Sequence, residues 1–470
     1  MLFPSITFLF YFLPLFFILY LMAPGNTAKN VVLLLASLIF YAWGEPRFVV
    51  FLAAQIVLNY GLALAIGATE GNRRTLVATA GVTVNLALLG LFKYADFAVG
   101  TLNAALGDAA FASPGLALPL GISFFTFHAI SYLIDVYRRG VQANRSLLSV
   151  AVYIAMFPQL VAGPIIRYHT IARRLGARRM TLGRVSAGMR IFVIGLAQKV
   201  LIADEASRIA ETVFDKLASP SMTEAWLGLA AYTIQIYFDF AGYSNMAIGL
   251  GLALGFSFPR NFRLPYTARS IAEFWRRWHI SLSQWLRDYL YIPLGGSRGS
   301  RAETYRNLWL VFVACGLWHG ANWTFVIWGV HHGAFLIAER VGLGGLLARH
   351  AWAARAYALL AIMSGWVWFR ARDVDHALSF FAILGGANGV ADVSIATHLA
   401  ANPATIAALL IGAILAMVAL DLRRLLHAVF GRLADLSFAL TDAAAIVVLF
   451  ALAILSVAAG SYSPFLYFRF

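Results

Sequence analysis

Long runs of apolar residues recur along the chain and determine what it can fold into. Four of them, residues 2–22, 116–134, 147–166 and 240–258, approach the roughly 20 residues that an α-helix needs to cross the hydrocarbon core of a membrane. Shorter or interrupted apolar stretches occupy residues 31–43, 48–69, 76–92, 191–203, 225–238, 356–369, 403–420 and 443–457. The pattern predicts an all-α polytopic membrane protein with about eleven spans.

The apolar segment at residues 147–166 does not fit a simple crossing. The loop before it, residues 138–145, is basic, and residues 167–190 after it carry seven arginines and no acid. Positive charge favours the cytoplasmic side, so both ends should face the cytoplasm. Because prolines and a glycine interrupt residues 158–164, we predict a re-entrant or strongly kinked element there, with Gln159 on a cavity wall. The alternative is a Pro-kinked span beside an external basic loop.

An amphipathic pattern follows at residues 271–289, where large apolar side chains recur three and four positions apart. The opposite face is polar and includes Arg276 and Arg277. A helix with tryptophan at its boundary and arginine on its polar face lies in the membrane interface rather than across it. Residues 291–296 then predict a tight turn, because they contain a proline and two adjacent glycines.

The composition supports a membrane protein over a set of soluble domains. Hydrophobic residues make up 61% of the 470 residues and charged residues 12%, with a mean hydropathy of +0.77. No internal repeat, low-complexity tract or long linker divides the chain. We therefore expect a single integral membrane domain over residues 1–470.

The net charge of +15 does not indicate nucleic acid as a partner. The basic residues are scattered through loops between apolar segments, where anionic membrane lipid and the positive-inside rule account for them. Cys315 is the only cysteine, which excludes an intramolecular disulfide and a cysteine-based zinc cluster. His331 and His332 are adjacent, so they point in different directions on a helix, and we expect no metal.

His319 is the first candidate for chemistry. It lies at the midpoint of residues 308–330, which contain no Asp, Glu, Lys or Arg, and a histidine at that depth is a functional-site hypothesis. A neutral imidazole can take a proton from a hydroxyl near physiological pH. Gly316 and Gly320 would let a backbone or a substrate approach, and Trp318 and Asn322 complete the motif. The alternative role of His319 is ordinary packing.

Two further polar residues interrupt apolar surroundings. His279 follows the double arginine, either as part of an acyl-transfer channel or as an interfacial residue that binds a neighbouring loop. Asp239 lies in residues 237–245 with Tyr243, and a carboxylate there must be paired or face a polar cavity. It could orient a catalytic histidine or help to form the cytoplasmic half of a channel. The alternative is an ion pair with Arg276 or Arg277.

Four stretches together resemble a known family. Residues 157–167, 235–249, 260–296 and 317–329 are similar to the membrane-bound O-acyltransferases, specifically the branch of bacterial alginate O-acetyltransferases. The resemblance is strongest over residues 150–340 and weaker over residues 373–470. It implies a helical core that is thin in the middle and open toward both faces, with interfacial and re-entrant helices around it.

The resemblance also implies roles for individual residues. His319 matches the catalytic histidine of the family and His279 a second, more variable one, whereas Asn245 stands where many relatives have an acid. The remaining candidates for the substrate channel or donor site are Asp239, Arg276, Arg277, Trp318, Asn322, Gln159 and Tyr243. The implied donor is acetyl-CoA, held at a basic cytoplasmic mouth, with no bound cofactor.

The implied function is O-acetylation of an exported polysaccharide such as alginate, by a multi-pass enzyme of the bacterial inner membrane. Periplasmic acetyltransferase partner proteins would receive the acetyl group. Two alternatives stay open. The same fold could transfer another acyl group, such as D-alanyl, or use peptidoglycan or cellulose as acceptor. The second alternative is a glycan transporter, in which the buried polar residues line a permeation path.

Overall fold

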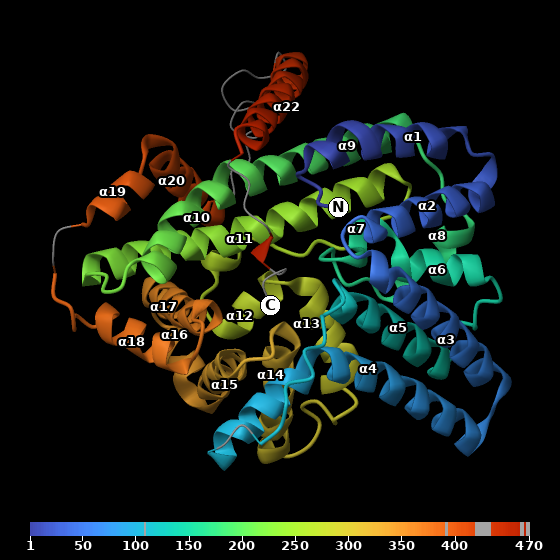
Figure 1. The fold of residues 1–470 in the computed structure, drawn as a ribbon, viewed down its shortest axis with the longest axis horizontal. Coiled ribbons are helices and arrows are strands. Elements are labelled where there is room, and N and C mark those ends of the chain that lie inside the picture. The colour runs from blue at the N-terminus through green and yellow to red at the C-terminus, as the bar shows by residue number, and fades with distance from the viewer. Residues whose placement is uncertain (108–109, 391–392, 419–433, 461–464, 467–470) are drawn as a thin grey trace. The chain divides into compact units, whose positions relative to one another are not determined.

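The computed structural model describes residues 1–107, 110–390, 393–418, 434–460 and 465–466. All regular elements within these residues are helical, and none is a strand, as the apolar pattern predicts (Figure 1). The chain is an all-α polytopic membrane protein. Its described residues form two compact units: the first comprises Met1–Met189, Ala247–Pro259 and Arg287–Tyr289, and the second comprises Arg190–Met246, Arg260–Leu286 and Leu290–Phe470.

The helices of the first unit come mainly from the N-terminal part of the chain. They are η1 (Thr7–Phe12), α1 (Leu13–Met22), α2 (Gly25–Ala42), η2 (Pro46–Phe48), α3 (Val49–Ala68), α4 (Gly71–Leu106), α5 (Ile122–Tyr137), α6 (Leu147–Ala155), α7 (Phe157–Leu160) and α8 (Tyr168–Gly176). Three helices contribute residues to both units: α9 (Leu182–Ala197), α11 (Met222–Ala253) and the π-helical turn η6 (Arg287–Tyr291).

The second unit holds the remaining helices. They are η3 (Gln198–Ala203), α10 (Asp204–Glu211), η4 (Thr212–Lys216), η5 (Pro265–Thr267), α12 (Ile271–Arg277), α13 (Ile280–Leu286), α14 (Arg301–His319), α15 (Trp323–Ala338), η7 (Glu339–Leu343), α16 (Gly344–Leu347), α17 (Ala351–Arg370), α18 (Val374–Leu384), α19 (Ile395–Ala400), α20 (Pro403–Met417) and α22 (Ala434–Ala458).

Within the described residues, five helical segments are long and apolar enough to cross a membrane. They are Gly25–Ala42, Pro46–Ala68, Gly71–Leu106, Leu182–Lys216 and Thr441–Ala458. The total of about eleven spans stays a prediction. Two expected boundaries are wrong: the separate stretches 225–238 and 240–258 belong largely to the single helix α11, and α5 begins only at Ile122, after an irregular stretch with Pro119 and Gly121.

The segment at residues 147–166 is broken and turns back toward its own start, which agrees with the predicted re-entrant or strongly kinked element. Helix α6 ends at Ala155, Met156 is extended with ψ 125°, and α7 lasts only four residues. The Asn144 side chain before the segment donates a hydrogen bond to the Tyr168 hydroxyl after it, at 3.0 Å. Because these two residues lie 24 positions apart yet touch, a straight crossing between them is excluded.

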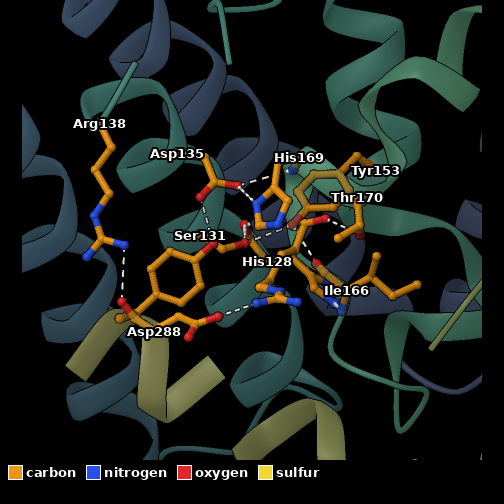
Figure 2. A network of polar contacts seen from close by, with 11 residues as sticks. His128, Ser131, Asp135, Arg138, Tyr153, Ile166, His169, Thr170 and Asp288 are labelled. Atoms are coloured by element: carbon orange, nitrogen blue, oxygen red, sulfur yellow. Dashed lines mark hydrogen bonds and ion pairs between the residues drawn. The ribbon is translucent and has the colours of Figure 1, made fainter. Parts of the chain in front are cut away.

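Buried side chains satisfy the irregular backbone at the end of this segment (Figure 2). The Tyr153 hydroxyl donates to the carbonyl oxygen of Ile166 at 2.7 Å, and the Ile166 N–H donates to Nε2 of His128 at 3.3 Å. Ser131 hydrogen-bonds the same Tyr153 hydroxyl at 2.9 Å. Non-helical backbone away from water survives only where the protein provides such partners.

Asp135, near the end of α5, ties two other segments of the first unit together (Figure 2). Its carboxylate accepts hydrogen bonds from the backbone N–H of His169 at 3.1 Å and from the Tyr289 hydroxyl at 2.7 Å, and it contacts Nδ1 of His169 at 2.9 Å. Asp288 forms an ion pair with Arg167, and its carbonyl oxygen accepts from Arg138 at 3.1 Å. Arg138 and Arg167, one from each basic loop, are therefore held against the same residue, Asp288.

Engineered cysteines test the returning segment. Gln142→Cys and Arg173→Cys, both at exposed positions on either side of it, should react with a membrane-impermeant maleimide from the same side of the membrane. Cys315 is buried and should stay unlabelled. Trp43→Cys, just beyond the far end of α2, is the control and should react from the opposite side. Labelling of positions 142 and 173 from opposite sides would contradict the assignment.

Candidate active site

Two buried histidines, His279 and His319, lie next to each other in the second unit. Their ring centroids are 6.4 Å apart, and their exposed fractions are 0% and 4%. Forty positions of sequence separate them. His279 lies between α12 and α13, whereas His319 is the last residue of α14. The planes of the two rings are inclined at 68° to each other.

His319 does not lie in the middle of a single span. Helix α14 ends there, Gly320 is extended, and α15 begins at Trp323, so the uncharged residues 308–330 form a helical hairpin (Figure 1). Asn322 causes the restart: its Oδ1 accepts from the Thr324 N–H at 3.0 Å, and its Nδ2 donates to the carbonyl of Arg372 at 2.8 Å. The amide of Asn322 thus serves as a helix cap rather than as a free channel group.

The glycines of this hairpin allow its two helices to pack at backbone distance. A Cβ atom on Gly316 would overlap the carbonyl oxygen of Phe325, and one on Gly329 would overlap that of Phe312. A Cβ on Gly320 would overlap the Phe325 ring. The predicted close approach at Gly316 and Gly320 is confirmed, and the approaching group is α15. This packing holds the end of α14 in place.

The start of α14 is fixed as firmly as its end. Ser300 and Glu303 form a capping box, with the Glu303 N–H donating to the Ser300 hydroxyl at 3.2 Å and the Ser300 N–H donating to the Glu303 carboxylate at 2.7 Å. The hydrogen bonds from the backbone and hydroxyl of Ser300 lower the pKa of Glu303 below its ordinary value. The carboxylate therefore stays charged at the helix N-terminus, where it is favourable.

Aromatic rings enclose His319. The ring centroids of Trp318 and Trp328 both lie 4.9 Å from its own, and that of Phe369 lies at 5.2 Å. Trp318 also lies 5.9 Å from His279, so it contacts both histidines. Sequence reasoning found Trp318 through the motif around His319. It missed Trp328 and Phe369, because neither has a neighbour in sequence that signals chemistry.

His279 interrupts the helix that the amphipathic pattern predicts over residues 271–289. Its φ of +41° is in the left-handed region that side chains other than glycine rarely adopt. Asn261 stabilises the break, since its carbonyl accepts from the Ile280 N–H at 2.9 Å and its Oδ1 accepts from the N–H and hydroxyl of Ser281 at 3.1 and 2.9 Å. Strained backbone of this kind clusters at functional sites. The interfacial position of the segment stays a prediction.

The ring of His279 is completely buried. It packs edge-on against Phe240 at 4.6 Å, and neither ring nitrogen has a hydrogen-bond partner among the described residues. A polar group that is fully buried normally finds a partner. The arrangement therefore suits a ligand that supplies one.

The partner of Asp239 is Lys199, so the alternative of an ion pair with Arg276 or Arg277 is wrong. Nζ of Lys199 lies 2.6 Å from a carboxylate oxygen of Asp239 and 2.6 Å from one of Asp204, and all three side chains are at most 3% exposed. The other oxygen of Asp239 accepts the Leu466 N–H at 2.8 Å. Lys199 belongs to the π-helical turn η3, a distortion that is common at functional sites.

Tyr243 belongs to the same aromatic cluster as His279. It is buried and stacks on Phe465 with ring centroids 4.8 Å apart. Phe465 in turn lies 5.9 Å from Phe240, the residue that contacts His279. The described part of the C-terminal segment therefore packs into this cluster of the second unit.

The other candidate residues differ in whether their side chains already make contacts within the protein. Arg277 forms an ion pair with Glu273 and donates to the carbonyl of Arg263, whereas the side chain of Arg276 is exposed. Gln159 lies in the first unit, where its amide donates to the carbonyl of Tyr153. Among the described residues, no group of three His, Cys, Asp or Glu side chains is placed to hold a metal ion.

Comparison with known proteins adds independent findings. A sequence model of the membrane-bound O-acyltransferase family matches residues 114–371. The chain is 43% identical to Probable alginate O-acetylase AlgI of Azotobacter vinelandii and 43% identical to the protein of that name from Pseudomonas putida, with all of each chain covered. It is 38% identical to the peptidoglycan O-acetyltransferase of Helicobacter pylori over 83% of this chain and 81% of the relative.

Removing the ammonium of Lys199 should destabilise the protein. Lys199→Met leaves two buried carboxylates without their cation, which typically costs about 3–5 kcal/mol. The thermal unfolding midpoint in detergent should fall sharply, whereas Lys216→Met, at an exposed position, should leave it unchanged. The compensated variant Lys199→Met/Asp204→Asn/Asp239→Asn should regain most of the loss. Equal stability of Lys199→Met and the wild type would rule out the ion cluster.

The backbone at position 279 gives a second test. At a φ of +41° alanine is strained and glycine is not, so His279→Gly should be about 1 kcal/mol more stable than His279→Ala. Ser283 inside α13 is the control, where the order should reverse because glycine weakens a helix. Denaturant unfolding of the four variants measures both differences. The same order at both positions would mean that His279 is not in the left-handed region.

Proposed function

Because the chain belongs to the membrane-bound O-acyltransferase family, we propose that it moves an acetyl group from acetyl-CoA toward an exported polysaccharide such as alginate. Membership of this family makes the chain a membrane-bound O-acyltransferase. The observation that carries the finer proposal is the pair His279 and His319, which lie 6.4 Å apart in an aromatic enclosure, within the residues that the family model matches.

His319 acts as the general base in this proposal. Its imidazole takes the proton of the acceptor hydroxyl, the hydroxyl oxygen attacks the carbonyl carbon of the acetyl thioester, and the carbon–sulfur bond breaks. The proton then passes to the departing thiolate, so that coenzyme A leaves as the thiol. His279, whose ring lies next to that of His319, donates a hydrogen bond to the carbonyl oxygen as negative charge develops there.

In this proposal the aromatic rings around His319 keep water away from the reacting groups. Trp318, Trp328 and Phe369 surround His319 and offer few groups that bind water. Exclusion of water limits hydrolysis of the thioester and strengthens the hydrogen bonds made to the reacting atoms. Arg276, whose side chain is exposed, is a candidate to contact the phosphates of acetyl-CoA at the cytoplasmic side.

We place the enzyme in the bacterial inner membrane, with periplasmic acetyltransferase proteins as partners that receive the acetyl group. The many apolar helices and the similarity to proteins named alginate O-acetylase support this proposal. Peptidoglycan is the second candidate acceptor, because one relative is named as a peptidoglycan O-acetyltransferase. Both acceptors present hydroxyl groups, so the chemistry at His319 is the same.

His319→Ala tests the proposed function directly. General-base assistance is worth about a hundred- to ten-thousandfold, so the variant should lose nearly all acetyl transfer while its membrane level stays normal. The measurement is the acetyl ester content of the exported polysaccharide in cells with matched protein levels. His331→Ala, on α15, is the control and should retain activity. Normal ester content in the His319 variant would refute the base role, and loss of polymer export would favour a transporter.

A further inference from the structure

A polar cavity in the first unit lies outside the site described above. Its volume is about 670 Å³, within the range of ligand pockets. It is formed where α3 meets α4, against the end of α5 and the basic loop that follows. The lining polar side chains are those of Thr69, Glu70, Arg74, Arg139, Gln142 and Arg145. Three arginines thus face a single acid.

Arg74 neutralises two helix ends at the wall of this cavity. Its guanidinium donates to the carbonyls of Ile66 and Thr69 at the end of α3, at 2.9 and 3.3 Å, and to those of Val136 and Tyr137 at the end of α5, at 2.6 and 3.2 Å. The C-terminal end of a helix carries partial negative charge. Arg74 compensates two such ends, so they do not repel an anion in the cavity.

The other two arginines are available to a ligand. Arg139 forms an ion pair with Glu70 at 3.7 Å, but the two side chains are 68% and 87% exposed, so the pair is weak. Arg139 follows the last turn of α5 with a φ of +59°, in the left-handed conformation that ends many helices, and its N–H donates to the carbonyl of Val136 at 3.0 Å. Arg145 is exposed and has no carboxylate within ion-pair distance among the described residues.

The location of the cavity indicates the source of the anion. Pro46–Ala68 and Gly71–Leu106 are both long and apolar enough to cross a membrane, and the cavity lies at the short turn between them. Two spans that meet in a turn end at the level of the lipid headgroups. Basic pockets between membrane helices on the cytoplasmic side bind anionic headgroups.

We propose that this cavity binds the phosphate of an anionic phospholipid from the leaflet on the basic side of the protein. Arg139 and Arg145 bind the phosphate oxygens, and Gln142 and Thr69 offer neutral hydrogen bonds to the rest of the headgroup. Leu64, Val136 and Val141 in the same lining contact the glycerol and the first acyl carbons. Neither His279 nor His319 lines this cavity.

The test compares lipid binding by matched variants of the full-length protein. Purified protein is titrated with phosphatidylglycerol or phosphatidylcholine in detergent, and bound lipid is counted by native mass spectrometry. Each arginine near an anionic headgroup is worth a factor of about five, so Arg139→Gln/Arg145→Gln should bind phosphatidylglycerol about twenty-five-fold more weakly. The control Arg349→Gln/Arg355→Gln removes two exposed arginines elsewhere and should bind as the wild type does.

Glu70→Gln gives a result that misfolding cannot imitate. Loss of this acid frees Arg139, so phosphatidylglycerol should bind severalfold more tightly. The proposal fails if the double arginine variant binds as the control does, or if phosphatidylcholine binds equally well. Displacement of phosphatidylglycerol by millimolar inorganic phosphate or coenzyme A would mean that the site takes a soluble phosphate instead of a lipid.

Discussion

Backbone N–H and C=O groups that lie away from water must find partners inside the protein, and the irregular segments of this chain depend on that constraint. Where helices stop, side chains take over the missing hydrogen bonds. Tyr153 and His128 serve the backbone of Ile166, and Asn261 serves the backbone that follows His279. These hydrogen bonds hold each irregular segment in one conformation, as backbone hydrogen bonds do in the helices beside it.

The candidate chemistry lies at such interruptions. His319 is the last residue of α14, and His279 lies between two short helices in a left-handed conformation. Inside a regular helix each of these side chains would share its surroundings with neighbours one turn away. At an interruption the chain can direct a side chain independently of its neighbours. This is how two histidines 40 positions apart come to face each other within 6.4 Å.

Local patterns predict what depends on local chemistry. The returning segment follows from its prolines, its glycine and the positive charge on both sides, and residues 291–296 do form a turn. The break at His279 does not follow, because Asn261, which stabilises it, is 18 positions earlier and belongs to no recognisable motif. The partner of Asp239 also depends on tertiary packing: Gly195 of α9 and Gly242 of α11 let these helices approach closely, and Lys199, which follows α9 in η3, reaches the carboxylate.

The buried ion cluster of the second unit does not include His279 or His319. Lys199 forms ion pairs with both Asp204 and Asp239, whereas aromatic rings surround His319. A buried ion cluster of this kind often adds less stability than apolar residues of the same volume would, so its value must lie in the geometry it specifies. Asp239 is adjacent to Phe240, which contacts His279, and it also binds the backbone of Leu466. Through Asp239 the cluster connects η3 and α10 to α11, the helix that carries Phe240.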